Sequence, residues 1–205
     1  MSHGELTGNQ LPAEPEKATL EGRNKILGFW FFLGGEMVLF GSLFATFIGL
    51  RNQIADGPAP QELINLTMTA VMTLILLTSS LTSVMAIQAM HRKDTAKMNL
   101  WFIVTFLLGL TFLILEIIEF VEYVHHGHKF TTSAYSSAFY TLVGFHGAHV
   151  TFGLGWLLTL LIPFGRKGLT VTTAPKMYVF GLYWHFVDVV WVFVFTIVYL
   201  MGKVG

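Results

Sequence analysis

The sequence predicts an all-α, polytopic membrane protein, a bundle of five transmembrane helices. Hydrophobic residues make up 54% of the 205-residue chain and charged residues only 12%, about half the usual share in a soluble domain. Five apolar runs are each long enough to cross a bilayer, which takes about 20 helical residues. The runs are continuous, whereas a transmembrane β-barrel would show alternating polar and apolar residues. Composition and run length therefore both favour membrane helices.

The predicted spans are separated by short connections that carry charges, prolines and glycines, which are typical of loops. These connections include residues 56–60, 91–94, 125–129 and 165–168. The spans cover residues 26–50, 66–90, 98–124, 136–164 and 177–201, and form one transmembrane domain over residues 26–202. Residues 1–25 mix acidic, basic and proline residues. We interpret them as a polar tail, disordered to about residue 20, and not as a secretory signal peptide.

Basic residues are distributed unevenly between the two ends of the predicted helices. All twelve lie outside the spans or at their ends. Nine are on the side of the N-terminus, namely Lys17, Arg23, Lys25, Arg92, Lys93, Lys97, Arg166, Lys167 and Lys176, and three are on the other side, namely Arg51, Lys129 and Lys203. The positive-inside rule therefore predicts a cytoplasmic N-terminus and a C-terminus outside.

The composition also excludes several classes of function. The net charge is zero, so no basic face indicates a nucleic-acid partner. The chain has no cysteine, which excludes disulfides, thiolate metal sites, iron–sulfur clusters and a cysteine nucleophile. It also excludes a two-cysteine copper centre.

Four acidic side chains lie deep within the spans, apart from Glu122 near the end of the third, and no Lys or Arg lies there to match them. They are Glu36, Glu116, Glu119 and Asp188. An ionisable group in hydrocarbon costs several kcal/mol unless it faces protein, water or a partner. Each acid must therefore be protonated, hydrogen-bonded, or matched by another subunit. Glu36 is either a proton-exchanging carboxyl or a neutral acid bonded to a neighbouring helix, and Glu119 is the acid of its helix that most needs a protein partner.

Small residues surround Glu36 on the first span. Gly34 and Gly35 precede it, and Gly41, Ala45 and Gly49 follow at a spacing of four. Such stripes allow close contact between membrane helices. They predict that the first helix is tightly packed against protein.

Histidines occur in the last two spans. His146 and His149 lie three residues apart and so share a helix face. We favour a polar contact between helices, with Glu36 or Glu119, over metal or haem ligation, for which His185 is the only other candidate in a span. His185 and Asp188 also lie three apart. They are expected to form a structural pair or one end of a network, with a proton relay as the alternative.

Four motifs resemble subunit III of the haem-copper respiratory oxidases. YWHFVDVVW at 183–191 resembles the signature of that family's last helix, and GFHGAHV at 144–150 resembles the segment in the preceding helix. EFVE at 119–122 resembles its E-x-x-E stretch, and Glu36 with the following MVLF resembles its carbodiimide-reactive membrane carboxyl. The motifs stand in the family's order and cover residues 24–202. The chain is similar to the short bacterial form, which has five helices and lacks the first two helices of the seven-helix form.

The resemblance implies an accessory subunit, without a redox centre, of an oxidase complex that reduces oxygen to water and pumps protons. Subunit III would pack on the catalytic subunit I, beside subunit II, in the bacterial plasma membrane, and support proton uptake. Haems and copper are expected in the partner subunits and no cofactor in this chain. Phospholipid is a candidate ligand, although half of the family's lipid cleft is missing from a five-helix chain. The positions carried over as structural or functional polar groups are Glu36, Glu119, His146, His149, His185 and Asp188.

Alternative functions remain open at this point. The electron donor is cytochrome c or quinol, with cytochrome c favoured. The buried acids could instead form the pathway of an independent proton transporter, although no central span is interrupted by proline. A haem-bearing cytochrome that uses His146 and His185 is the third alternative.

Overall fold

The protein is a single bundle of long helices in the computed structural model, which describes residues 11–54, 65–125 and 127–204. The helices are α1 (Leu20–Leu50), α3 (Leu66–His91), α4 (Thr95–His125), α5 (Ala134–Lys167) and α6 (Ala174–Val194), which continues through the π-helical turn η3 (Phe195–Leu200) into α7 (Met201–Val204). Within these described ranges, five helices are long and apolar enough to cross a membrane. The prediction of an all-α fold with five membrane-type helices is confirmed.

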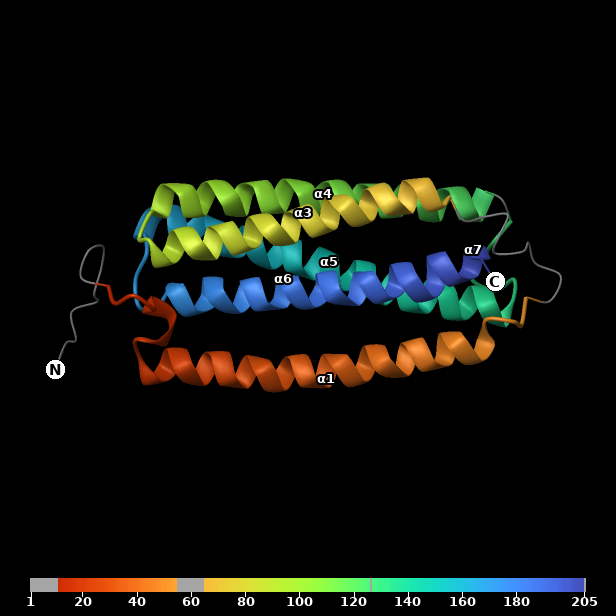
Figure 1. The fold of residues 1–205 in the computed structure, drawn as a ribbon, viewed down its shortest axis with the longest axis horizontal. Coiled ribbons are helices and arrows are strands. Elements are labelled where there is room, and N and C mark those ends of the chain that lie inside the picture. Colours follow the sequence, from red (N-terminus) through yellow and green to blue (C-terminus); the bar gives the residue numbers. More distant parts are fainter. Residues whose placement is uncertain (1–10, 55–64, 126, 205) are drawn as a thin grey trace.

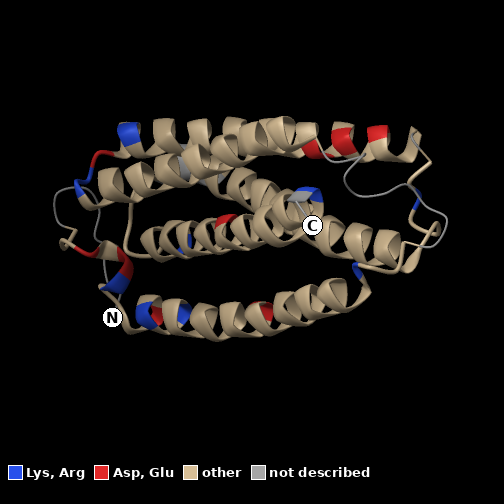
Figure 2. Ribbon diagram, turned by 45° about the vertical axis from the view of Figure 1, so that its right-hand side comes forward, with Lys and Arg blue, Asp and Glu red and all other residues tan. Residues whose placement is uncertain are grey.

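The helices run antiparallel along one axis, so that α1 begins at one end of the bundle and α7 ends at the other (Figure 1). The helices α3 and α4 lie side by side along one edge, α5 and α6 form the middle, and α1 lies along the opposite edge, where it packs on α5 and α6. Lys and Arg lie near the two ends, whereas acidic residues also occur midway along the helices (Figure 2). Acids at bilayer depth therefore need partners inside the protein or beyond it.

Local signals explain where the helices begin. Thr19 precedes α1, and its hydroxyl accepts a hydrogen bond from the Gly22 amide at 3.0 Å. Asn65 precedes α3 and accepts in the same way from the Met68 amide at 3.2 Å. Both are N-caps, which bind amides that the first helical turn leaves without partners. Pro175 stands in the first turn of α6, where the missing amide proton is not needed.

The N-terminal segment is more ordered than the sequence suggests. The predicted tail covers residues 1–25, of which residues 1–10 lie outside the described residues. Disorder to about residue 20 is wrong for residues 11–19, because Pro15–Lys17 form a 3₁₀ turn, η2, that packs on α6 and α1. The Glu16 carboxylate is buried and contacts His91 Nε2 at 3.2 Å and 3.3 Å. The segment closes over one end of the bundle, and α1 starts at Leu20 instead of residue 26.

The glycine stripe of α1 makes no close contact with the other described helices of this chain. A Cβ atom added at Gly34, Gly35, Gly41 or Gly49 would meet nothing within 4 Å, so close packing of α1 against protein stays a prediction for contacts with other subunits. The tight contact is at Gly109 of α4, where an added Cβ would lie 2.6 Å from the Trp184 ring of α6. Small residues permit a close approach, but the neighbouring helix must supply a large side chain to use it.

Candidate functional site

Glu119 is the centre of a buried hydrogen-bond cluster that joins three segments of the bundle. Its Oε1 accepts from the Thr69 hydroxyl at 3.2 Å and from the Tyr123 hydroxyl at 2.8 Å. Its Oε2 accepts from Tyr199 at 3.0 Å. Tyr199 lies in the π-helical turn η3, and such turns change the direction in which the following side chains point. Glu119 therefore has the protein partners that its depth in the membrane requires.

The tryptophans of the last helix bind hydroxyl groups on α3. Trp184 Nε1 donates to Ser79 Oγ at 3.0 Å, and Trp191 Nε1 donates to Thr73 Oγ1 at 3.0 Å. Tyr183 donates to the backbone carbonyl of His149 on α5 at 2.9 Å. Buried indole and phenol groups need such partners. The segment 183–191 therefore ties α6 to α3 and α5.

Glu36 and His149 meet across α1 and α5. His149 Nε2 lies 3.0 Å from Glu36 Oε2, while His149 Nδ1 donates to the carbonyl oxygen of Phe145 at 2.6 Å. A carbonyl only accepts, so Nδ1 must carry a proton, and Nε2 of a neutral ring is then an acceptor. The contact consequently needs one further proton, either on the Glu36 carboxyl or on the ring. Glu36 and His149 are 16% and 18% exposed, so this shared proton lies near the surface of the bundle.

His185 and Asp188 do not contact each other as the sequence led us to expect. His185 Nδ1 lies 2.6 Å from Ser80 Oγ on α3. The Ser80 hydroxyl also hydrogen-bonds the Asp188 carboxyl, and Asp188 Oδ1 has no protein partner. The expected network exists, but Ser80 connects its two members. The motif spacing could not reveal Ser80, because one serine among the several on α3 carries no distinguishing signal.

His146 and Glu116 lie in the middle of the bundle. Both are buried, and among the described residues neither ring nitrogen of His146 nor either carboxylate oxygen of Glu116 has a hydrogen-bond partner. The polar contact with Glu36 that we expected for this histidine pair is made by His149, whereas His146 packs between the rings of Phe112 and Trp191. His146 and His149 therefore point to different surroundings although they share one side of α5.

Metal ligation can be tested against the described part of the chain. No group of three or more His, Asp or Glu side chains in it is gathered to hold a metal ion. Ser80 occupies Nδ1 of His185, and Glu36 and the Phe145 carbonyl occupy both nitrogens of His149. The side chains therefore bind one another across helix interfaces.

Comparisons with known proteins found similarity over nearly the whole chain. Residues 16–203 match the family described as cytochrome c oxidase subunit III. Cytochrome c oxidase subunit 3 of Bacillus sp. (strain PS3) is 61% identical over 98% of this chain and 97% of its own length. The protein of the same name from Bacillus subtilis (strain 168) is 59% identical, again over 98% and 97%. Quinol oxidase subunit 3 of the same strain is 47% identical over the full length of both chains. The chain therefore belongs to the cytochrome c oxidase subunit III family of the haem-copper oxidases.

Proposed function

We propose that this subunit III serves a bacterial oxidase that takes electrons from cytochrome c, and that it packs on the catalytic subunit I beside subunit II in the plasma membrane, with its N-terminus in the cytoplasm. The observation that carries the choice of donor is the higher identity, 61% and 59%, to relatives named for cytochrome c, against 47% to one named for quinol. Its own role is structural: it supports the catalytic subunit and its proton uptake and holds no redox centre.

The donor can be tested on the purified complex. Oxygen consumption is measured with reduced cytochrome c and, separately, with a quinol. We expect turnover with cytochrome c and a partner subunit that carries a two-cysteine copper motif. Turnover with quinol alone would favour the alternative, a quinol oxidase. An isolated chain that moved protons into liposomes would instead support the transporter alternative.

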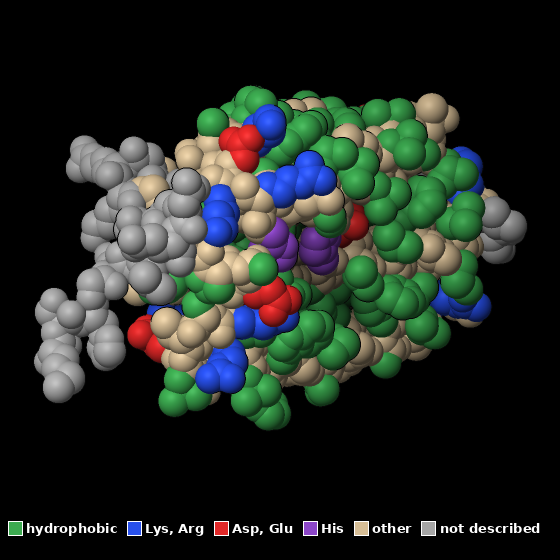
Figure 3. Space-filling model, turned by 60° about the vertical axis from the view of Figure 1, so that its left-hand side comes forward, with side chains coloured by type: hydrophobic (Ala, Val, Ile, Leu, Met, Phe, Trp, Pro, Cys, Tyr) green, Lys and Arg blue, Asp and Glu red, His purple; other side chains and the backbone are tan. Residues whose placement is uncertain are grey.

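We infer that the face across α3 and α6 contacts the catalytic subunit. Ser80, His185 and Asp188 lie there at mid-depth, and polar groups on an outward face are costly against lipid. Figure 3 shows histidine side chains with an acidic side chain next to them, basic side chains on one flank and hydrophobic side chains on the other. The outward side of α4, in contrast, presents large apolar residues such as Ile114 and Leu107, 49% and 55% exposed, which suit lipid.

Because the chain has no cysteine, single-cysteine variants can be labelled to test which face contacts the catalytic subunit. Val189, which follows His185 by one turn of α6, is 53% exposed, and Ile114 near the middle of α4 is 49% exposed. In the intact complex we expect Val189→Cys to be protected from a membrane-permeant maleimide and Ile114→Cys to react. Equal labelling of the two variants, or protection of Ile114→Cys alone, would contradict the proposed face.

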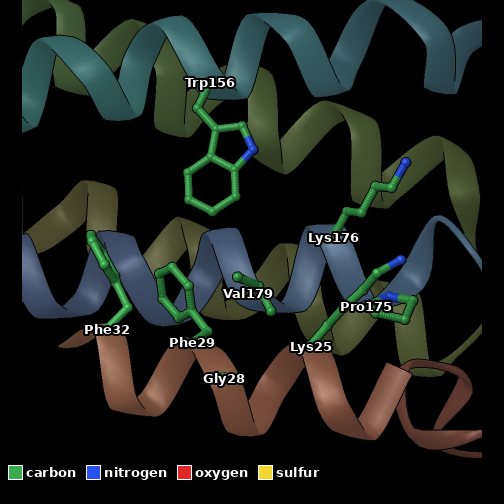
Figure 4. Close-up of a pocket in the computed structure, with 8 residues that line it drawn as sticks. All are labelled: Lys25, Gly28, Phe29, Phe32, Trp156, Pro175, Lys176 and Val179. Atoms are coloured by element: carbon green, nitrogen blue, oxygen red, sulfur yellow. The ribbon is translucent and has the colours of Figure 1, made fainter. Parts of the chain in front are cut away.

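A groove between α1 and α5 suits a phospholipid. Phe29 and Phe32 of α1 and Trp156 of α5 line it, and Lys25 and Lys176 lie at one end, as Figure 4 shows. The cavity has a volume of about 330 Å³, and a wider apolar hollow of about 670 Å³ with the same three aromatic residues adjoins it. The rings would contact acyl chains and the ammonium groups the phosphate. Mass spectrometry of the delipidated complex should show less retained phospholipid after Lys176→Ala than in the unmodified protein, and equal retention would argue against this site.

We propose that the Glu36–His149 pair fastens α1, the most exposed helix, to the rest of the bundle. The adjacent contact between the rings of Phe40 and His149, 5.0 Å apart, supports this role. Because the contact needs a shared proton, Glu36→Gln should preserve it, since an amide can donate to Nε2. Glu36→Leu should release α1, measured as faster proteolysis of the first loop in the complex. Equal proteolysis of the two variants would contradict a fastening role.

A further inference from the structure

Two fully buried polar side chains in the middle of the bundle have no protein partner. Glu116 on α4 is 2% exposed and His146 on α5 is 0% exposed. Both carboxylate oxygens and both ring nitrogens lack a hydrogen bond within the described chain. Buried polar groups in native proteins are nearly always hydrogen-bonded. Two adjacent exceptions therefore call for a ligand that supplies the missing bonds.

The two side chains face the same interface between α4 and α5. The Glu116 carboxyl lies against Gly147, the residue after His146: a Cβ atom at Gly147 would be 3.0 Å from both carboxylate oxygens. Phe112, one turn before Glu116 on α4, contacts the ring of His146 edge-on at a centroid distance of 6.0 Å. Trp191 of α6 contacts the same ring on another side, at a centroid distance of 5.1 Å.

The polar groups around this space are already engaged. Trp191 Nε1 donates to Thr73, so it is not available to His146. Tyr123 and Tyr199 donate to Glu119. These three side chains therefore donate to other groups and not to Glu116 or His146. A small polar molecule is a ligand that would complete the missing bonds.

We propose that Glu116 and His146 form an internal water-binding site, in which ordered water connects the carboxyl group on α4 to the imidazole on α5. A buried polar group without a partner costs about 1–3 kcal/mol, whereas a buried water typically makes about three hydrogen bonds. A protonated carboxyl donates one bond and accepts another, and a neutral imidazole offers one donor and one acceptor. A water molecule matches these two donors and two acceptors, because it can both donate and accept hydrogen bonds.

The site lies near the polar contacts described above. Glu119, with its cluster on α3 and η3, follows Glu116 by three residues on α4. His149, which holds Glu36 of α1, follows His146 by three residues on α5. The proposed water site therefore lies about one helical turn from each of these two groups of polar contacts.

The direct test is a cryo-EM map of the intact oxidase at a resolution that shows ordered water. We expect density for water within hydrogen-bond distance of the Glu116 carboxyl and of a His146 ring nitrogen. A direct hydrogen bond between the two side chains would overturn the proposal. So would a side chain of another subunit that fills the space, or two well-ordered side chains without water density.

Infrared spectroscopy of the complex provides a second test that does not depend on map quality. The carbonyl band of the Glu116 carboxylic acid is identified by its loss in Glu116→Gln, and we expect it at the frequency of a hydrogen-bonded acid. A band at the frequency of a free acid would overturn the proposal.

A matched pair of glycine variants keeps the test valid if Glu116→Gln fails to assemble. Gly147→Ala must displace the carboxyl by a few tenths of an ångström, whereas an added Cβ at Gly144 meets nothing within 4 Å. We expect Gly147→Ala to shift the acid band and Gly144→Ala to leave it unchanged. If both variants leave the band unchanged, the carboxyl does not occupy the proposed site.

Discussion

At Gly109, α4 lies too close to α6 to leave room for a side chain. In the variant Gly109→Ala, the new Cβ would lie 2.6 Å and 2.7 Å from two carbons of the Trp184 ring and 3.0 Å from a Leu154 methyl. Carbon atoms in ordinary contact are about 3.5–4.0 Å apart, so α4 and α6 would have to separate or the indole would have to move. The indole is constrained, because Trp184 Nε1 donates to Ser79 and the ring stacks on Phe180.

The expected loss of stability follows from these contacts. Overpacking a core costs about 1–3 kcal/mol, and a displaced indole also weakens a hydrogen bond worth about 1 kcal/mol. Replacing a helical glycine by alanine returns about 0.5–1 kcal/mol. Gly109→Ala should therefore destabilise the protein by about 1–3 kcal/mol. The matched variant Gly155→Ala, whose added Cβ meets nothing within 4 Å, should be neutral or stabilising.

The assay is thermal denaturation of the intact complex, followed by the release of this subunit on native gels. About 1 kcal/mol shifts the midpoint by about 2–4 °C for a chain of this size. We expect the Gly109→Ala midpoint to lie at least about 2 °C below that of Gly155→Ala. Equal midpoints would refute the reasoning, because they would mean that α4 and α6 do not approach each other at Gly109.

Four further variants test other parts of the structure. Glu119→Ala leaves the Tyr123 and Tyr199 hydroxyls without their acceptor and should destabilise the complex more than Tyr199→Phe, which removes one bond worth about 0.5–1.5 kcal/mol. The reverse order of melting midpoints would contradict the cluster. Glu16→Ala removes the contact with His91 and should speed proteolysis within residues 11–19, while unchanged cleavage would show that the segment is held by other contacts. Burial lowers the pKa of His128 below its ordinary value of 6.5, so the unfolded chain binds this proton more readily and stability should fall as pH drops below about 6.5. His128→Asn should flatten that dependence in melting curves, and an unaltered pH profile would exclude the histidine as its source.

Much of the fold could be predicted from the sequence because membrane insertion depends on local composition. Each predicted span overlaps one of the five helices, and α3 differs from its prediction, residues 66–90, only by ending at His91. The family was also recognisable, because its motifs at 144–150 and 183–191 are contiguous. Glu119 was rightly expected to need protein partners, since the cost of an acid in hydrocarbon does not depend on which helix lies next to it.

The N-terminal segment and the glycines make contacts that could not be predicted from the sequence of one segment. Glu16 looks like a solvent-exposed acid of a polar tail, and its burial depends on His91, which lies 75 residues away in the sequence. Gly34 and Gly109 are equally small, yet only Gly109 faces a tryptophan. No pattern within one helix reports the side chain on its neighbour.

The long apolar runs of the sequence determined the number of membrane helices. Because no Lys or Arg lies in the spans, the sequence also determined that the buried acids need other partners. The tertiary structure alone decided which groups meet: Glu36 contacts His149 and not His146, and Ser80 stands between His185 and Asp188. It also left Glu116 and His146 without protein partners. The physical reason is that hydrophobicity sums along the chain, whereas a hydrogen bond depends on the rotation and spacing of two packed helices, which many distant side chains set together.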